Sequence, residues 1–207
     1  MFNTQEKRER ALGVKLFTKP HRCNSPKCAL TRRASRPGFH GKRRRRALSE
    51  FGQQLQEKQK FQWSYGLRDS YMKRIFREAV KNPAVTGDTI IHLLERRLDN
   101  VVFRLGIAPS RSVGRQLVGH GHIMINGRKM TIPSYRVRVG DIITIRPESS
   151  GYALFQNLSA TLKNYTTPEW LAIDDAKIEG KVLRLPSETE DSFDVNKVVD
   201  YYAKIVK

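Results

Sequence analysis

The stretch from Leu94 to Arg146 constrains the fold more than any other part of the chain. Its first part predicts a helix with one buried face, because apolar residues recur there at spacings of three and four: Leu94, Leu98, Val101, Val102 and Leu105. Gly106 suits a left-handed helix end, and Pro109 prevents simple continuation. Ser110 is then placed to cap a second, shorter helix.

Four short runs follow and predict strands: His122–Asn126, Arg128–Ile132, Tyr135–Val139 and Ile142–Arg146. The first two meet at Asn126-Gly127, which is the strongest short signal for a tight hairpin. The last two turn at Gly140-Asp141. We therefore expect a compact module, residues 94–151, in which two small helices pack on short antiparallel strands.

The module is basic. Residues 94–146 contain ten Lys and Arg against three Asp and Glu. Arg111 and Arg115 are four residues apart, so we expect them on one outward face of the second helix, while Arg128 and Lys129 follow the hairpin turn. One interpretation is an ordinary solvated face. The convergence of cations from separate elements favours another, a surface for the phosphates of folded RNA, to which amides at the Ser110 helix start would contribute.

The charge of the whole chain also indicates a polyanionic partner. A formal net charge of +19 over 207 residues, with a pI near 10.3, exceeds what solubility requires. Nucleic acid is the commonest such partner, and an anionic membrane surface is the alternative. No apolar run approaches the roughly 20 residues of a spanning helix, and no signal-peptide core follows Met1. We expect a cytoplasmic protein.

Residues 1–46 carry fifteen Lys and Arg against two Asp and Glu, with few large apolar residues, so we expect an irregular arm without a core of its own. The arm ends in five consecutive cations: Lys42, Arg43, Arg44, Arg45 and Arg46. A solvated tail or a targeting signal is one interpretation, and an arm that becomes ordered on RNA is the other. Phe39 and His40 are candidates for stacking on bases, although Phe39 would serve equally as an apolar anchor.

Helical patterns flank the module. Residues 48–82 carry apolar and aromatic stripes at helical spacing, and residues 153–162 and 196–205 also have helical patterns. We expect an α+β chain with a discontinuous helical domain into which the module is inserted. Its parts are the basic arm, 1–46, the helical domain, 47–93 and 152–207, and the module, 94–151.

We find no catalytic motif. The chain has no G-x-x-x-x-G-K phosphate loop, no G-x-G-x-x-G after a strand and no H-E-x-x-H. His120 and His122 form the only local histidine pair, and in a loop between a helix and a strand they suit RNA phosphates or bases better than a metal. We expect no catalytic residue and no cofactor.

Several segments resemble one protein family. Residues 93–143, from LLERRLDNVVFRLG to SYRVRVGDII, are similar to the RNA-binding module named after the fourth protein of the bacterial small ribosomal subunit. The flanking segments RPGFHG (36–41), LSEFGQQLQEKQKFQWSYGL (48–67) and PEWLAIDDAKIEGKVLRLP (168–186) are similar to that ribosomal protein family itself. The resemblance covers nearly the whole chain after about Gly13, in one order.

The resemblance implies a structural ribosomal protein, not an enzyme, that binds small-subunit (16S) ribosomal RNA directly and nucleates assembly of the subunit body. It also implies a contribution to translational accuracy, contact with the neighbouring small-subunit ribosomal protein five, and a position of Lys42–Arg46 beside messenger RNA at its entry path. Besides that run, we expect twelve residues to contact RNA: Arg97, Arg104, Ser110, Arg111, Arg115, Gln116, His120, His122, Asn126, Arg128, Lys129 and Tyr135.

Two other functions use the same module. An RNA-modifying enzyme of the pseudouridine synthase type would need a large catalytic domain with an essential aspartate, whereas only about 60 residues follow the module here. A free RNA chaperone of the heat-shock kind gives no reason for the helical domain before the module.

His21, Cys23, Cys28 and His40 are potential metal ligands. Many members of the resembled family bind zinc here through four cysteines, an upstream C-x-x-C pair and a pair spaced like Cys23 and Cys28. Residues 1–20 contain neither Cys nor His, and a structural zinc site wants four tetrahedral ligands. We expect no metal site.

Elemental analysis of the folded protein should therefore find no stoichiometric zinc. Cys23→Ser combined with Cys28→Ser should leave RNA affinity in filter-binding nearly unchanged, because the pair holds no metal to lose. One zinc per chain would contradict this expectation and would make His21 or His40 a ligand.

Overall fold

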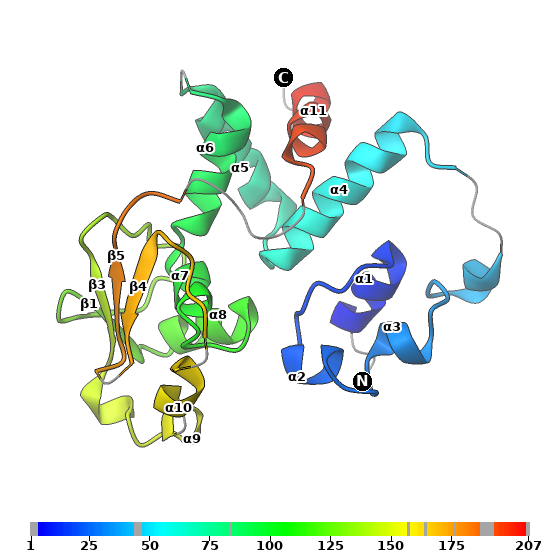
Figure 1. Cartoon of the computed structure of the whole chain (residues 1–207). Coiled ribbons are helices and arrows are strands. Elements are labelled where there is room, and N and C mark those ends of the chain that lie inside the picture. The colour runs from blue at the N-terminus through cyan, green and yellow to red at the C-terminus, as the bar shows by residue number, and fades with distance from the viewer. Residues whose placement is uncertain are drawn as a thin grey trace. The chain divides into compact units, whose positions relative to one another are not determined.

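The structure is a computed structural model that describes residues 4–43, 47–82, 84–156, 158–163, 165–175, 177–186 and 193–205. It contains two compact units. The first consists of residues 1–89 and 190–207, and the second of residues 90–189. Figure 1 labels the elements in chain order.

Three helices build the centre of the first unit: α4 (Glu50–Ser64), α5 (Asp69–Val80) and α11 (Val195–Ile205). The final helix packs on the other two, and ring contacts of Tyr202 in this helix and of Phe193 just before it hold it there. The centroid of the Phe61 ring lies 5.1 Å from that of Phe193, and the rings of Phe76 and Tyr202 are 5.6 Å apart. Edge-to-face and offset pairs of this kind stabilise beyond the area they bury. The helices expected within residues 48–82 and 196–205 are confirmed.

A buried charge joins the same three helices. The Lys58 side chain is almost fully buried and forms an ion pair with Asp69, which also accepts a hydrogen bond from the Tyr202 hydroxyl at 3.3 Å. Burial, together with the charge of Asp69, raises the pKa of Tyr202 above its ordinary value, so this hydroxyl stays protonated and donates.

The N-terminal segment is folded, so the expectation of an irregular arm was wrong for the described residues 4–43. It forms four short elements: α1 (Thr4–Leu12), α2 (Pro20–Cys23), α3 (Ala29–Arg32) and the 3₁₀ helix η1 (Phe39–Lys42). Leu12, Leu16, Cys23 and Cys28 are buried, and α1 packs on α3 and contacts α4. These apolar residues are too few for a local pattern and form a core only through tertiary contacts.

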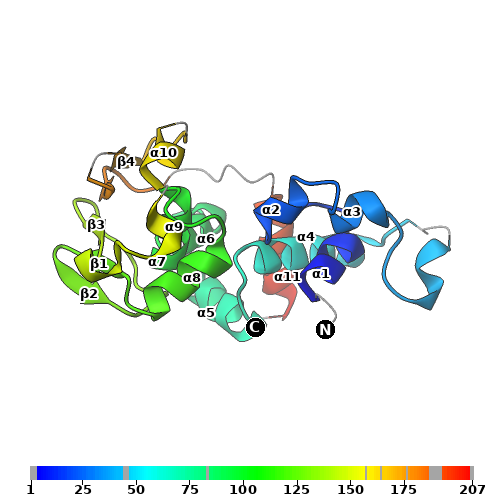
Figure 2. The ribbon, with the colours of Figure 1, turned by 90° about the horizontal axis from the view of Figure 1, so that it is seen from below.

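The second unit contains the module. Its helices α7 (Leu98–Arg104) and α8 (Arg111–Gly119) pack against each other, as Figure 2 shows from below. The strands form one antiparallel sheet in the order β2-β1-β3-β5-β4. Their bounds are β1 (Ile123–Ile125), β2 (Arg128–Met130), β3 (Ile142–Ile145), β4 (Leu171–Asp174) and β5 (Glu179–Val182). Apolar side chains of both helices and the sheet make a single core, so the expected α+β module is confirmed.

The hairpin turn has the predicted form. Asn126 and Gly127 have φ of 49° and 75°, the left-handed pair that a two-residue turn of this type requires. The turn fixes the register, with Ile125 opposite Arg128 and Ile123 opposite Met130. Alternation then buries Ile123 and Ile125 on β1, whereas Arg128 and Lys129, on the edge strand β2, are both exposed.

The second unit is larger than the expected module. We expected residues 152–207 to join the helical domain, but only residues 190–207 do so. Strand β5 pairs with β3, and Phe155, Leu158 and Leu162 are buried in the core of the module. The intervening elements are η2 (Pro147–Ser149), α9 (Ala153–Gln156) and α10 (Leu158–Leu162). Without β5, the edge of β3 would present unpaired backbone groups, which is the reason the sheet continues.

Two expected elements of the module differ from the prediction. The helix expected through Leu105 breaks, with α6 (Thr86–Glu95) ending before α7 begins. The run Tyr135–Val139 is no sheet strand, because its backbone bonds to the break instead. The carbonyl of Tyr135 accepts from the Leu98 amide at 2.8 Å, and the amide of Val137 donates to the Arg96 carbonyl at 2.9 Å. The bond from Leu98 satisfies an amide that the first turn of α7 would leave unpaired.

Gly114 allows the close contact of α7 and α8. A Cβ atom at this position would lie 2.6 Å from the carbonyl oxygen of Asp99, whereas one at Gly119, on the same helix, would meet nothing within 4 Å. The two glycines are therefore a matched pair.

We expect Gly114→Ala to lower the free energy of unfolding of the second unit by about 1–3 kcal/mol, because the helices must move apart. Gly119→Ala should leave it unchanged or raise it by up to about 1 kcal/mol through helix propensity. Denaturant unfolding followed by Trp170 fluorescence, in a Trp63→Phe background, measures both. Equal effects of the two substitutions would contradict the packing argument.

Candidate nucleic-acid interface

A buried carboxylate organises the arginines at the start of α7. Asp99 is 2% exposed and binds the Arg97 guanidinium through two hydrogen bonds, at 3.0 and 2.8 Å. Its Oδ2 atom also accepts from Nε and Nη2 of Arg115, at 2.9 and 2.8 Å. One carboxylate thus fixes two guanidinium groups, one from each side of the α7–α8 contact.

A second buried carboxylate, that of Glu95, holds another set of side chains. Its two carboxylate oxygens accept from Nε and Nη2 of Arg104, both at 3.1 Å, and one oxygen also accepts from the Asn100 amide at 2.8 Å. The carbonyl oxygen of that Asn100 side chain accepts from Nε of Arg111 at 2.8 Å. All four side chains are buried. We call the seven residues of these two sets the arginine network: Glu95, Arg97, Asp99, Asn100, Arg104, Arg111 and Arg115.

The arginine network corrects one sequence expectation. We expected Arg111 and Arg115 on an outward face, but Arg111 is buried and its guanidinium lies 4.9 Å from the Phe103 ring centroid. The side chain of Arg115 is 37% exposed and is held by Asp99. Arg97 and Arg104 are buried as well. The helical periodicity was correct, but the direction of the face depends on the buried carboxylates of α6 and α7.

Other predicted residues have clear structural tasks. The Ser110 hydroxyl accepts from the Val113 amide at 3.4 Å and caps α8 as predicted. Asn126 donates to Asp141 at 2.9 Å and accepts from the Ile142 amide, so it fastens the hairpin to β3. Tyr135 is half-buried and packs against the core of the module.

A basic cluster lies where α8 meets the hairpin. His120 and Lys129 are exposed, and His122 donates to or accepts from Ser149 at 2.9 Å. Burial, and then the nearby charges of His120, Arg146 and Lys129, lower the pKa of His122 below its ordinary value. The ring is therefore neutral at pH 7 and able to accept or donate a hydrogen bond. Gln116 and Arg128 are exposed on the two adjoining elements. We call this group the hairpin cluster.

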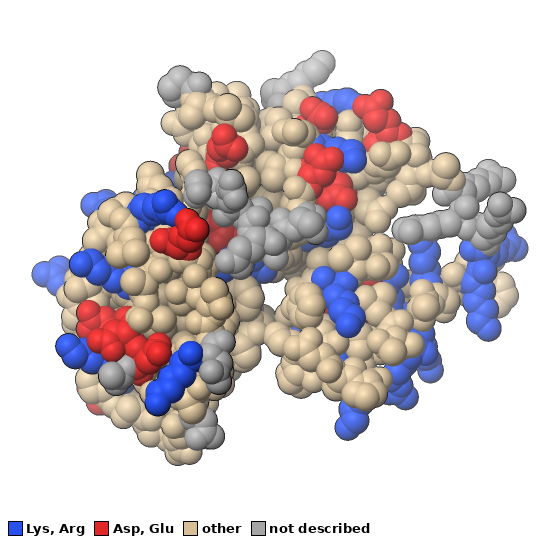
Figure 3. All heavy atoms as spheres, in the orientation of Figure 1, with Lys and Arg blue, Asp and Glu red and all other residues tan. Residues whose placement is uncertain are grey.

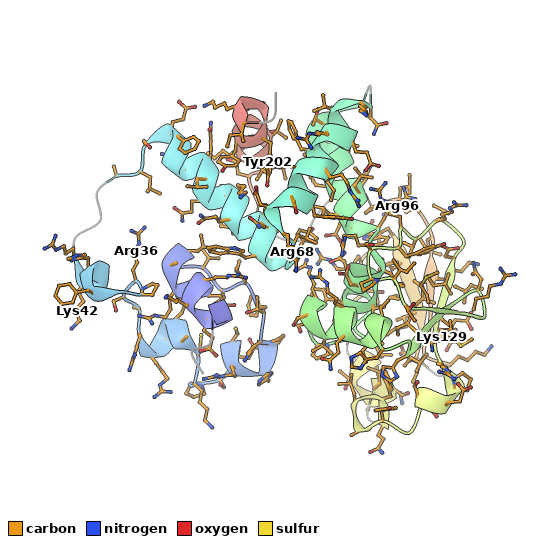
Figure 4. All side chains as sticks on the ribbon, turned by 180° about the vertical axis from the view of Figure 1, so that it is seen from behind. Arg36, Lys42, Arg68, Arg96, Lys129 and Tyr202 are labelled. Atoms are coloured by element: carbon orange, nitrogen blue, oxygen red, sulfur yellow. The ribbon has the colours of Figure 1, made fainter. Side chains whose placement is uncertain are left out.

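A second cluster escaped the sequence reasoning. Burial, and then the neighbouring charges of Arg136 and Arg138, lower the pKa of the Arg96 guanidinium, which donates to the Val137 carbonyl at 2.9 Å. Figure 4 shows Arg96 and Lys129 at different places on the module, so the two clusters are separate. The alternation Arg136-Val137-Arg138 was the available signal, because it puts both arginines on one side of an extended chain.

The basic run after η1 is described only in part. Lys42 and Arg43 are exposed, whereas Arg44, Arg45 and Arg46 lie outside the described residues. Figure 3 shows Lys and Arg side chains gathered over the segment from α3 to η1, with few acidic side chains on that face.

The cysteine segment does not fit a four-cysteine zinc site. Sγ of Cys23 lies 3.8 Å from a carboxylate oxygen of Glu9, which also accepts from the Thr18 hydroxyl at 3.1 Å. Cys23 and Cys28 are both buried, and both candidate histidines are exposed. Among the described residues, no group of three or more His, Cys, Asp or Glu side chains is placed to hold a metal ion. The expected absence of zinc stays a prediction.

Comparison with known families defines the class of protein. Residues 96–143 match the model described as the S4 domain, and residues 3–95 match the Ribosomal protein S4/S9 N-terminal domain. The described helices include none that is long and apolar enough to span a membrane.

Curated relatives match along almost the whole chain. Small ribosomal subunit protein uS4 of Syntrophomonas wolfei is 47% identical over 194 residues, which are 93% of each chain. The Thermus thermophilus protein of the same name is 46% identical over 195 residues, and that of Gloeobacter violaceus 44% over 197. This chain belongs to the uS4 family.

The arginine network makes a prediction about stability. Asp99→Asn should lower the free energy of unfolding of the second unit by about 3–5 kcal/mol, because the buried Arg97 guanidinium and the partly exposed Arg115 guanidinium lose their counter-charge. Glu169→Gln is the matched control, since the Glu169–Arg184 pair is exposed and should contribute little. Denaturant unfolding followed by Trp170 fluorescence, in a Trp63→Phe background, measures both. A loss no larger than that of the control would show that the network does not stabilise the module.

Proposed function

We propose that this protein is a structural component of the small ribosomal subunit that binds small-subunit ribosomal RNA directly and nucleates assembly of the subunit body. It is not an enzyme: its relatives are named as ribosomal subunit proteins. As a protein of the small ribosomal subunit it is located in the cytoplasm.

The observation that carries this proposal is the order and extent of the sequence similarity to ribosomal proteins. The two family models follow one another over residues 3–143, and the relatives match 93% of their own length. A pseudouridine synthase or a free chaperone would share only the module with this chain. Neither alternative accounts for the match of residues 3–95 to the Ribosomal protein S4/S9 N-terminal domain.

Binding by shape is the mechanism that the described surfaces support. Exposed cations lie on rigid elements: Arg128 and Lys129 on β2, and Arg138 in the segment bonded to α7. Rigid cations meet phosphates at fixed positions with little loss of side-chain entropy. A protein that binds several RNA helices in their assembled arrangement stabilises that arrangement by mass action. This is how binding would nucleate assembly.

The finer assignments belong to the same proposal. The exposed Lys42 and Arg43 begin the basic run that we propose lies beside messenger RNA at its entry path. We further propose contact with the neighbouring small-subunit ribosomal protein five and a contribution to translational accuracy. Family membership supports these assignments.

Filter-binding to small-subunit ribosomal RNA at several salt concentrations tests the proposal. We expect log K to fall against log salt with a slope of about −0.7 to −0.9 per neutralised phosphate. Arg128→Ala with Lys129→Ala should weaken binding and reduce the slope by about 1–2, because two phosphate contacts are lost. The control is Lys177→Ala with Lys181→Ala, the same charge change in the same unit beside the acidic residues Asp174, Asp175 and Glu179. Figure 3 shows acidic side chains gathered on the second unit.

A slope near zero in the unaltered protein would contradict electrostatic RNA binding. An equal effect of the two double variants would show that the hairpin cluster is not part of the RNA-binding surface.

A further inference from the structure

A cavity of about 860 Å³ lies in the N-terminal segment, between α1, α3 and η1. Its lining comes from residues 6–42, and none of it belongs to the module. The proposed function assigns a task to one lining residue, Lys42, but none to the cavity itself. Its composition is unusual, because eight of its fourteen lining residues are Lys or Arg and only one is acidic.

Most of these charges have no counter-charge. Glu6, the acidic residue, pairs with Arg22 at 2.7 Å, and the guanidinium of Arg10 is bound by backbone carbonyls. Within the described part of the chain, no carboxylate forms an ion pair with the other six lining cations. They are Lys7, Lys27, Arg32, Arg33, Arg36 and Lys42. Six like charges around one cavity repel one another, so a polyanion that enters it relieves the repulsion.

The cavity wall is held in place by specific contacts. Nε of Arg10 donates to the carbonyl oxygens of Arg33 and Ser35, both at 3.1 Å, and its Nη2 donates to Ser35 at 2.8 Å. This guanidinium therefore ties the loop after α3 to α1. Gly41 packs so closely on the Arg36 carbonyl that a Cβ atom would lie 1.9 Å from it. Figure 4 labels Arg36 and Lys42 on the two sides of this loop and 3₁₀ helix.

Phe39 adds an aromatic face to the cavity. Its side chain is 96% exposed, although it is a large apolar group, and its ring meets His40 edge to face at 5.1 Å between centroids. Phe39 is therefore not an apolar anchor of the fold, and its ring is open to solvent. An exposed ring beside uncompensated cations is the combination by which proteins bind single-stranded nucleic acid, since bases stack on the ring while the cations contact the backbone.

We propose that this cavity binds an unstacked nucleotide of single-stranded RNA, with its base on Phe39 and its flanking phosphates among the six cations. The inference rests on the proposed function and deepens it, because it gives the N-terminal segment an RNA site separate from the module. Six cations, from α1, from the segment that runs from Lys27 through α3 to Arg36, and from η1, exceed the charge of one phosphate and match a short stretch of backbone.

The test uses the full chain and two short ligands of equal phosphate number, a single-stranded oligouridylate and its abasic ribose-phosphate analogue. Phe39→Ala should weaken oligouridylate binding about 5- to 150-fold and leave the abasic ligand unaffected. Phe39→Tyr should restore binding, and Phe39→Leu should not. Arg32→Ala with Arg36→Ala should weaken both ligands, while the Lys177 and Lys181 double variant described above should weaken neither strongly.

Three outcomes would overturn the proposal. If Phe39→Ala affects both ligands equally, or neither, no base stacks on Phe39. If the Arg32 and Arg36 variant binds both ligands as the unaltered chain does, the cavity does not bind RNA. Free uridine triphosphate is the third probe, and tighter binding of it than of the oligomer would assign the cavity to a free nucleotide. Ribosomal RNA binding measured on the same proteins separates the two hypotheses, because the proposed function fails only if the unaltered chain does not bind that RNA.

Discussion

The module depends on two buried carboxylates. Asp99 and Glu95 are 2% and 1% exposed, and each is bound by guanidinium groups through two or more hydrogen bonds. Removing such charges from water is costly, so the carboxylates are tolerable only while every partner stays in place. The partners come from α7, α8 and the break before α7, and the close α7–α8 contact at Gly114 completes the arrangement. The backbone at this break also forms hydrogen bonds with residues 133–137, which hold that segment against the start of α7.

These carboxylates also divide the basic residues of the chain into two classes. Arg97, Arg104 and Arg111 are buried beside anionic or amide partners, so they stabilise the fold and contribute little to a surface potential. Arg128, Lys129 and Arg138 are exposed on rigid backbone and are available to phosphates. The ten Lys and Arg of residues 94–146 therefore include several that are buried in the fold and add little to the surface potential of the module.

The two units offer RNA different kinds of surface. The module presents cations on a short sheet and on segments bonded to helices, which suits the fixed phosphate spacing of folded RNA. The N-terminal segment has few apolar residues and instead holds its shape through Glu9, Arg10 and the contact of α1 with α4. Its cations surround a cavity with an exposed ring, which suits an unpaired strand.

The sequence by itself determined the local features of this protein. The Ser110 cap, the Asn126-Gly127 hairpin, the helical stripes of residues 48–82 and the basic character all follow from short-range patterns, because propensity, turn geometry and periodicity are local properties. Tertiary structure decided which cations face solvent, since Arg111 turns inward toward Asn100 from a different helix. It also decided that β5 extends the sheet and that residues 4–43 fold. These features depend on partners far apart in the chain, whose pairing no local pattern encodes.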